Sequence, residues 1–158
     1  MDNQLNPENL LHRRQFILGD RPITNFYTWK TVPFGSLHLT VHPDLDLTIS
    51  KRSNNEFILL GFALNHKRPQ AGNQEILDEL ADICHFLEDM LEYCRDLCGR
   101  YLILFNISDK SGILTDLIAS RTVYYCSTAQ SIWCASQPST LAKVLKISKD
   151  NSSLIRTF

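Results

Sequence analysis

The cysteines are the first residues of this chain whose type and spacing could do chemistry. Cys94 and Cys98 lie four residues apart, and Cys84 with His85 precedes them, so the group could be drawn as a metal site. The spacing is not the C-x-x-C of zinc motifs, and Cys84 and Cys94 fall on an apolar helical stripe. Since free cysteine is among the most buried residue types, we expect core thiols here.

Histidines and aspartates suggest a second metal site. His38, His42 and His66 can be grouped with Asp44 and Asp46. Polar and apolar residues alternate over 36–42, however, which is typical of a strand with one solvated face. We therefore interpret these histidines as surface residues and expect neither a metal ion nor another cofactor.

Composition limits the classes of function. The 158 residues are 44% apolar, enough for the core of one domain, and the net charge of -1 favours neither nucleic acid nor an anionic membrane. The longest apolar runs are less than half of the roughly 20 residues that a membrane span needs. The first residues lack the apolar core of a signal peptide, so we expect a cytoplasmic protein. Five cysteines, an odd number, indicate reduced thiols.

The pattern along the chain predicts a flexible leader over 1–14, a single domain over 15–147 and a tail over 148–158. Strands are expected at 15–18 and, more weakly, at 26–32. The alternating stretches 36–42 and 45–49 are expected to pair as a hairpin around Pro43-Asp44. The stretch 56–64 is apolar on both faces, so it should be a central strand.

Helical periodicity dominates the middle of the chain. Apolar residues from Asn73 to Leu97 recur at spacings of three and four, which predicts one long helix with Asn73 as N-cap and Gly99 as its stop. Four strands should follow, at 100–107, 112–115, 122–127 and 132–135, and then a helix from Pro138 through Lys146 capped by Ser136 or Gln137. This order favours an α+β fold in which two sheets pack face to face beneath outer helices.

The stretch from Cys98 to Leu145 carries a family resemblance. Its order is G-R-Y-L-I-L-F, a turn, L-T-D, then S-R-x-x-Y-Y, a turn, and A-S-x-x-x-x-L. This resembles the second half of the glutaminase domain of asparagine synthetases and other class II glutamine amidotransferases. The matching residues are Gly99, Tyr101, Asp116, Arg121, Tyr124, Tyr125, Ala135, Ser136 and Leu141, and the departures are Thr115, Ser120, Thr122, Val123 and Gln137. The resemblance implies a four-layer αββα sandwich of two mainly antiparallel sheets, of the N-terminal-nucleophile type.

The activity implied by the resemblance depends on a nucleophile that this sequence lacks. Family members use a cysteine as the first mature residue, whose free α-amino group acts as the base for the thiol. This chain begins Met1-Asp2, and every cysteine lies at or after Cys84. We therefore expect no catalytic residue of this kind and no working glutaminase.

The substrate-holding positions implied by the resemblance are also altered. The family's oxyanion-hole Asn and Gly fall on Leu60 and Gly61, and the last Asn of that motif falls on Asn65. Loss of an oxyanion donor costs about a hundredfold to a thousandfold in rate. The Ser-Asp pair that binds the glutamine ammonium group falls on Asn73-Gln74, which carries no charge.

Asp116 and Arg121 flank a turn, where an ion pair between adjacent strands is a simpler interpretation than catalysis.

Two functions remain open from the sequence. In the first function, the chain is a silent glutaminase-like domain that docks onto an ATP-pyrophosphatase-type, amide-forming domain or subunit, or onto a second copy of itself. A chain ending at Phe158 would then be a truncated or free-standing first domain. In the second, it is an amidotransferase or amidohydrolase with another nucleophile in the same cleft.

Overall fold

The computed structural model describes residues 13–24, 26–52, 54–108, 110–128 and 131–147. The expected tail, and the expected leader apart from Arg13 and Arg14, lie outside these residues. So do Asp109, which lies between the expected strands 100–107 and 112–115, and Ala129 and Gln130, which lie between the expected strands 122–127 and 132–135. Among the described residues, no helix combines the length and apolar character needed to cross a bilayer.

Two antiparallel sheets form the centre of the molecule. One has five strands in the order β2 (Lys30–Phe34), β3 (Leu37–Val41), β1 (Phe16–Gly19), β9 (Ile132–Ala135) and β8 (Tyr124–Ser127). The other has four strands in the order β4 (Leu47–Arg52), β5 (Asn55–Asn65), β6 (Leu97–Ile107) and β7 (Lys110–Thr115). The described helices are α2 (Asn73–Ile83), α3 (Leu87–Cys94) and α4 (Pro138–Leu145).

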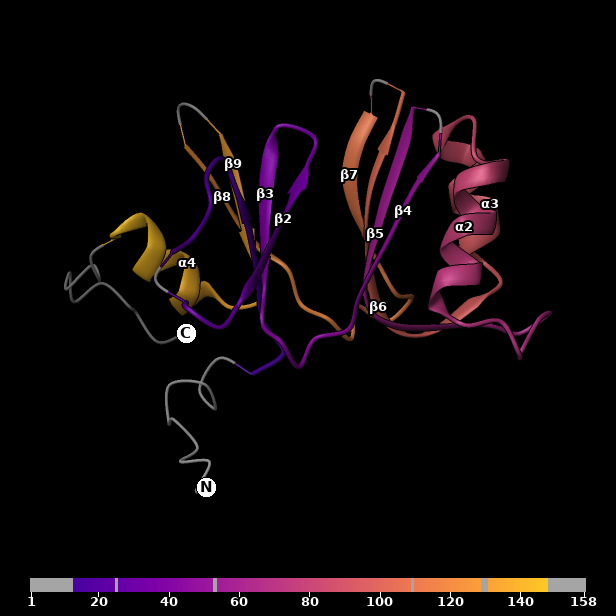
Figure 1. Cartoon of the computed structure of the whole chain (residues 1–158), viewed down its shortest axis with the longest axis horizontal. Coiled ribbons are helices and arrows are strands. Elements are labelled where there is room, and N and C mark those ends of the chain that lie inside the picture. The colour runs from indigo at the N-terminus through magenta and orange to yellow at the C-terminus, as the bar shows by residue number, and fades with distance from the viewer. Residues whose placement is uncertain (1–12, 25, 53, 109, 129–130, 148–158) are drawn as a thin grey trace, which may run out of the picture.

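The sheets pack face to face, and helices cover both outer faces (Figure 1). Ile58 and Leu60 of β5 point between the sheets, where they meet Phe16 and Leu39. The alternate residues of β5, such as Leu59, pack under α2 and α3. A third cluster, which includes Trp133, lies beneath α4. The expected α+β fold with two antiparallel sheets is thus confirmed. The central strands β5 and β6 bury apolar residues on both faces, because the other sheet covers one face and helices cover the other.

Several local predictions are confirmed. The 56–64 stretch lies in β5, which is central in its sheet, and the predicted strand 132–135 coincides with β9. Helix α4 begins at Pro138, with Gln137 as its N-cap. Lys146 ends the helix in a left-handed conformation (φ 54°).

The single long helix is wrong, because the chain forms two helices there. Helix α2 ends at Ile83, and Phe86 is an extended N-cap for α3. The carboxylate of Asp89 accepts hydrogen bonds of 2.8 Å from the backbone N–H groups of His85 and Phe86, so a new helix start is satisfied within the apolar stripe. Both helices bury the same face of one sheet, and periodicity alone therefore does not reveal the break.

Both predicted helix boundaries also shift. The N-cap is Gly72 rather than Asn73, and the Glu75 carboxylate accepts a hydrogen bond of 2.8 Å from the Gly72 N–H. Gly99 does not stop a helix, since it lies within β6 at φ +131°. A β-carbon there would collide with the Phe62 carbonyl oxygen of the neighbouring strand, which explains the glycine.

The predicted hairpin of 36–42 with 45–49 is wrong as well. Its first strand, β3, pairs with β1 and β2, whereas β4 pairs with β5 in the opposite sheet. The polar face of β3 is not solvated: Thr40 and His42 are buried, and the Trp29 ring packs edge-on against His42. Trp29 belongs to a turn that replaces the first half of the expected strand 26–32, and β2 begins only at Lys30.

Candidate functional site

A cavity of about 510 Å³ opens at the place where β1 begins. Its walls come from the start of β1, the residues before β4, the β5–β6 pair and the segments that precede β8 and α4. Guanidinium and carboxylate groups dominate its lining: Arg13, Arg14, Asp44, Asp46, Arg100 and Arg121. Four cations against two anions leave the cavity with two positive charges in excess.

Arg121 is the least exposed of these cations. Its Nε donates a hydrogen bond of 3.2 Å to the carbonyl oxygen of Arg100. Burial is the main cause that lowers the pKa of Arg121, and the nearby charges of Arg100 and Arg14 lower it further, against the opposing effect of Asp46 and Asp116. The Arg121 guanidinium therefore lies close enough to Arg100 and Arg14 for both charges to repel it.

Arg13 and Arg14 differ in how their charge is balanced. The Arg13 Nε donates to the Asp44 carboxylate at 2.6 Å, and this hydrogen bond lowers the pKa of Asp44. Among the described residues, Arg14 and Arg100 form no ion pair. Arg14 also adopts a left-handed backbone (φ 56°), which is unfavourable for a residue with a β-carbon and tends to occur at functional sites.

Hydroxyl groups also line the cavity. The Ser120 Oγ donates a hydrogen bond of 2.5 Å to Asp116, a buried carboxylate. Burial raises the pKa of Asp116, but hydrogen bonds from the Ser120 hydroxyl and from the N–H groups of Ser120 and Ile118 outweigh it and hold the pKa below its ordinary value. A carboxylate stabilised in this way is a weak base, so it does little to activate Ser120.

Ser136 has a structural role at the cavity wall. Its Oγ accepts a hydrogen bond of 3.1 Å from the Phe16 N–H, and its own N–H donates to the Phe16 carbonyl. Thr122 donates through its hydroxyl to the Ser136 carbonyl. The Gln15 side chain just before β1 is buried, and its Oε1 accepts from Thr140 at 3.1 Å. These bonds attach the start of β1 to the start of α4.

The cavity has no cysteine in its described lining. Cys84 and Cys94 are buried, as expected of core thiols, Cys134 is buried as well, and all five cysteines are free. Burial raises the pKa of Cys84 to about 11 and that of Cys94 to about 12, so both stay protonated at neutral pH. The core interpretation is wrong for Cys98, which is exposed, and Cys126 is half-buried.

The positions that the resemblance assigned to the glutamine pocket do not gather around the cavity. Leu60 is fully buried between the sheets. Gly61 (φ +99°) lies beneath Arg121, and a β-carbon on it would stand 2.6 Å from Arg121 Nε. The Gly61 N–H already donates to the Asp46 carbonyl at 2.9 Å, so it is not available to stabilise an oxyanion.

Asn73 and Gln74 act as clamps rather than as ligand-binding groups. Asn73 accepts from the Ala63 N–H at 3.0 Å and donates to the Gly61 carbonyl at 2.9 Å, which joins the start of α2 to β5. Gln74 donates to the Ile49 carbonyl and to Asp78.

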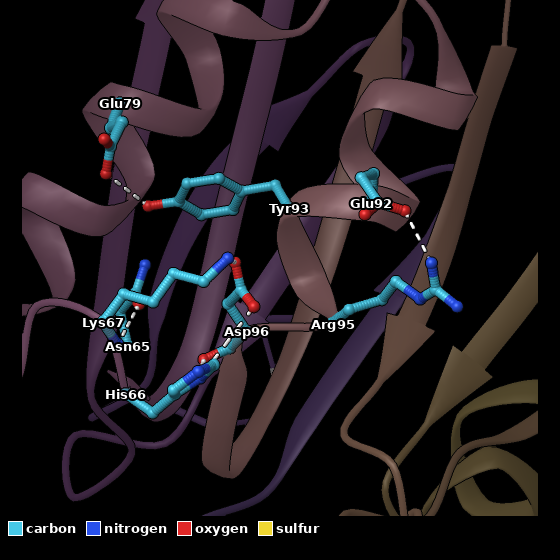
Figure 2. Close-up of polar contacts among 8 residues, drawn as sticks. All are labelled: Asn65, His66, Lys67, Glu79, Glu92, Tyr93, Arg95 and Asp96. Carbon is cyan, nitrogen blue, oxygen red and sulfur yellow. Dashed lines mark hydrogen bonds and ion pairs between the residues drawn. The ribbon is translucent and has the colours of Figure 1, made fainter.

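Asn65 belongs to a second polar cluster, at the C-terminal end of β5 (Figure 2). There Lys67 pairs with Asp96 at 2.6 Å, and the Tyr93 hydroxyl reaches Glu79 of α2 at 2.6 Å. Asn65 accepts from the Lys67 N–H. The charges in this cluster are paired, so it braces α2 and α3 against β5 and offers little to a ligand.

Asp116 and Arg121, which were expected to form an ion pair across a turn, hydrogen-bond to other partners instead. Asp116 bonds to Ser120 and Ile118, whereas Arg121 bonds to the Arg100 carbonyl. His66 lies beside Asp96, in the second polar cluster, and His42 lies at the end of β3, where its Nδ1 accepts from the Asp44 N–H. Within the described part of the chain, no group of three or more His, Cys, Asp or Glu side chains is arranged to hold a metal ion.

Sequence reasoning missed most of the cavity. Arg13 and Arg14 fall within the stretch 1–14 that was predicted to be a flexible leader. Arg100 is the one charge inside the predicted apolar strand 100–107, and Arg121 was interpreted as a turn residue. A charge on an otherwise apolar strand was the available signal. A comparison with protein-family models finds no match, and one with curated proteins finds none either.

Proposed function

We propose that this chain is a catalytically silent glutaminase-like domain of the αββα, N-terminal-nucleophile type, related to that of asparagine synthetases. One observation carries the proposal: arginines occupy the cavity at the head of β1, and no thiol lines it in the described structure. The layer order and the antiparallel sheets agree with this fold. Amide hydrolysis also requires an oxyanion donor, and the Gly61 N–H is already engaged by the Asp46 carbonyl.

A docking role follows from the surface near this cavity. Phe62 and Leu64 at the end of β5 are 49% and 47% exposed, and Leu117 and Ile118 after β7 are 85% and 84% exposed. The strand register brings these segments to the same end of the four-stranded sheet. Exposed apolar side chains grouped in this way are typical of protein contacts. The occupant we propose is an ATP-pyrophosphatase-type, amide-forming domain or subunit.

Catalytic silence is tested by glutamine hydrolysis with the purified chain, followed by treatment with a glutamine-analogue electrophile. We expect no ammonia release above buffer and no adduct. The alternative is an amidohydrolase with another nucleophile, for which the Ser120 hydroxyl in the cavity wall is the candidate even though its partner Asp116 is a weak base. Hydrolysis that Ser120→Ala abolishes, or an adduct mapped to any cysteine, would establish that alternative instead.

Docking is tested by searching the genome for a neighbouring frame that encodes an ATP-pyrophosphatase-type subunit, and by co-expressing that subunit with this chain for size-exclusion chromatography. The Leu117→Asp/Ile118→Asp variant should lose the complex, whereas Tyr27→Asp, at a side chain 97% exposed elsewhere on the molecule, should keep it. If the chain alone forms a dimer that the double variant dissolves, the occupant is a second copy. A genome without such a neighbouring frame would count against the synthetase partner.

A further inference from the structure

The charged side chains that line the cavity carry more positive than negative charge. Asp44 is engaged by Arg13, so Asp46 in the lining and Asp116 behind Ser120 are left to offset Arg14, Arg100 and Arg121. Gathering three guanidinium groups around one cavity is electrostatically unfavourable unless an anion joins them.

The backbone is arranged to keep these cations together. Gly61 leaves open the space that the Arg121 guanidinium fills, since a β-carbon there would stand 2.8 Å from one of its terminal nitrogens. Arg14 reaches the cavity from a left-handed backbone. The carbonyl of Arg100 anchors Arg121, while the Arg100 side chain lines the same cavity. Three separate segments thus converge on one point.

We propose that this cavity binds a compact small molecule that carries a phosphoryl or diphosphoryl group, held by Arg14, Arg100 and Arg121. Arginine presents planar pairs of N–H donors that match phosphate oxygens, and a diphosphate brings two or more negative charges within a few ångströms. A ligand with a single carboxylate would supply only one negative charge against the three arginines. The volume of about 510 Å³ also suits a small ligand. The Phe62 ring in the same wall could contact a nucleoside attached to the phosphate. This inference holds whether or not a protein partner docks nearby.

Isothermal titration calorimetry of the full chain with pyrophosphate at low salt tests the proposal. We expect saturation at one pyrophosphate per chain and weaker binding as salt rises. Arg100→Gln and Arg121→Gln should each weaken binding by about tenfold or more, because each removes charge-assisted hydrogen bonds. The matched control is Arg95→Gln, which removes the same charge from a residue paired with Glu92 on the helical side. Equal loss in Arg95→Gln would overturn the site, as would no binding at all.

A gain-of-affinity variant guards against misfolding. Asp46→Asn removes a negative charge from the cavity wall, so it should tighten pyrophosphate binding several-fold, which an unfolded chain would not do. ADP identifies the source: tighter binding than pyrophosphate indicates a nucleotide, and equal binding indicates a free phosphate compound. Citrate that binds more tightly than pyrophosphate, or an RNA oligonucleotide that displaces it at lower concentration, would overturn the proposal.

Discussion

The guanidinium group of Arg121 lies directly over Gly61, so close that a β-carbon on Gly61 would stand 2.6 Å from its Nε. The same β-carbon would press against the Arg100 carbonyl oxygen. The cavity wall therefore depends on the smallest side chain at one position of a central strand.

The first prediction concerns that glycine. Gly61→Ala should lower the free energy of unfolding by about 1–3 kcal/mol, since the backbone there has φ +99° and the new methyl group meets backbone and guanidinium atoms. Urea unfolding measures the change. Gly35→Ala is the control: Gly35 also has positive φ (+54°), but its β-carbon would meet only Asn106 Nδ2, at 3.7 Å. It should lose about 1 kcal/mol. An equal loss in both variants would contradict the close contact.

The second prediction concerns the clamp formed by Asn73. Asn73→Ala leaves the Ala63 N–H and the Gly61 carbonyl without their partner, which should destabilise the fold by about 1–3 kcal/mol. Gln74→Ala, the adjacent position, removes an exposed amide and should cost well below about 1 kcal/mol. Thermal unfolding distinguishes the two. If Gln74→Ala proved the more damaging, α2 would be attached to the sheet differently.

The third prediction concerns acid stability. Although burial alone would raise it, the pKa of Asp116 is lowered in the folded protein by its hydrogen bonds from Ser120 and Ile118. A folded-state pKa below the unfolded value contributes stability above the ordinary value of 3.8 and loses it as the pH falls through the lower, folded value. The urea midpoint of unfolding should therefore drop as the pH falls below 3.8, the ordinary pKa of the carboxyl group.

Asp116→Asn is the matched variant for this effect. The amide keeps a carbonyl oxygen to accept the backbone N–H groups but cannot titrate, so the variant should be less stable near pH 7 and show a shallower decline in acid. Parallel pH curves for the two proteins would mean that Asp116 titrates alike in the folded and unfolded states.

The fourth prediction concerns thiol reactivity. In the native protein at pH 8, a disulfide reagent such as DTNB should react readily with exposed Cys98 and half-buried Cys126, whereas the buried thiols of Cys84, Cys94 and Cys134 should react only after unfolding. Burial raises the pKa of all three, so little thiolate forms. Cys98→Ser should remove one rapid equivalent. Rapid labelling of Cys134 would indicate that the core between the sheets opens easily.

Periodicity predicted most strands of this fold but not their partners. The stretches 36–42 and 45–49 both alternate, yet β3 and β4 belong to opposite sheets, because the chain crosses between the layers after His42. Alternation indicates which residues share a face of a strand, but not which strand pairs with it. The break between α2 and α3 was not predicted for a similar reason, since the same apolar periodicity runs through both helices and both pack into one core.

The cavity was harder to foresee than the fold. Its charged residues come from positions near 13, 45, 100 and 121, and the register of two separate sheets brings them together. The resemblance directed attention to Leu60, Asn65, Asn73 and Gln74, which the structure uses for packing and clamping. Arg121 was noticed as a turn residue, and its cavity role depends on Gly61, a neighbour 60 positions earlier in the sequence.

The position of β1 between β3 and β9 has a consequence for the order of events on the ribosome. The four-stranded sheet and its two helices come from one continuous stretch, residues 47–115, and can form once that stretch has emerged. The five-stranded sheet cannot, because Phe16 bonds to Ser136, 120 residues later. During synthesis, β1 must therefore wait unpaired on one side until β9 appears. The segment that walls the arginine cavity should be among the last parts of the chain to settle.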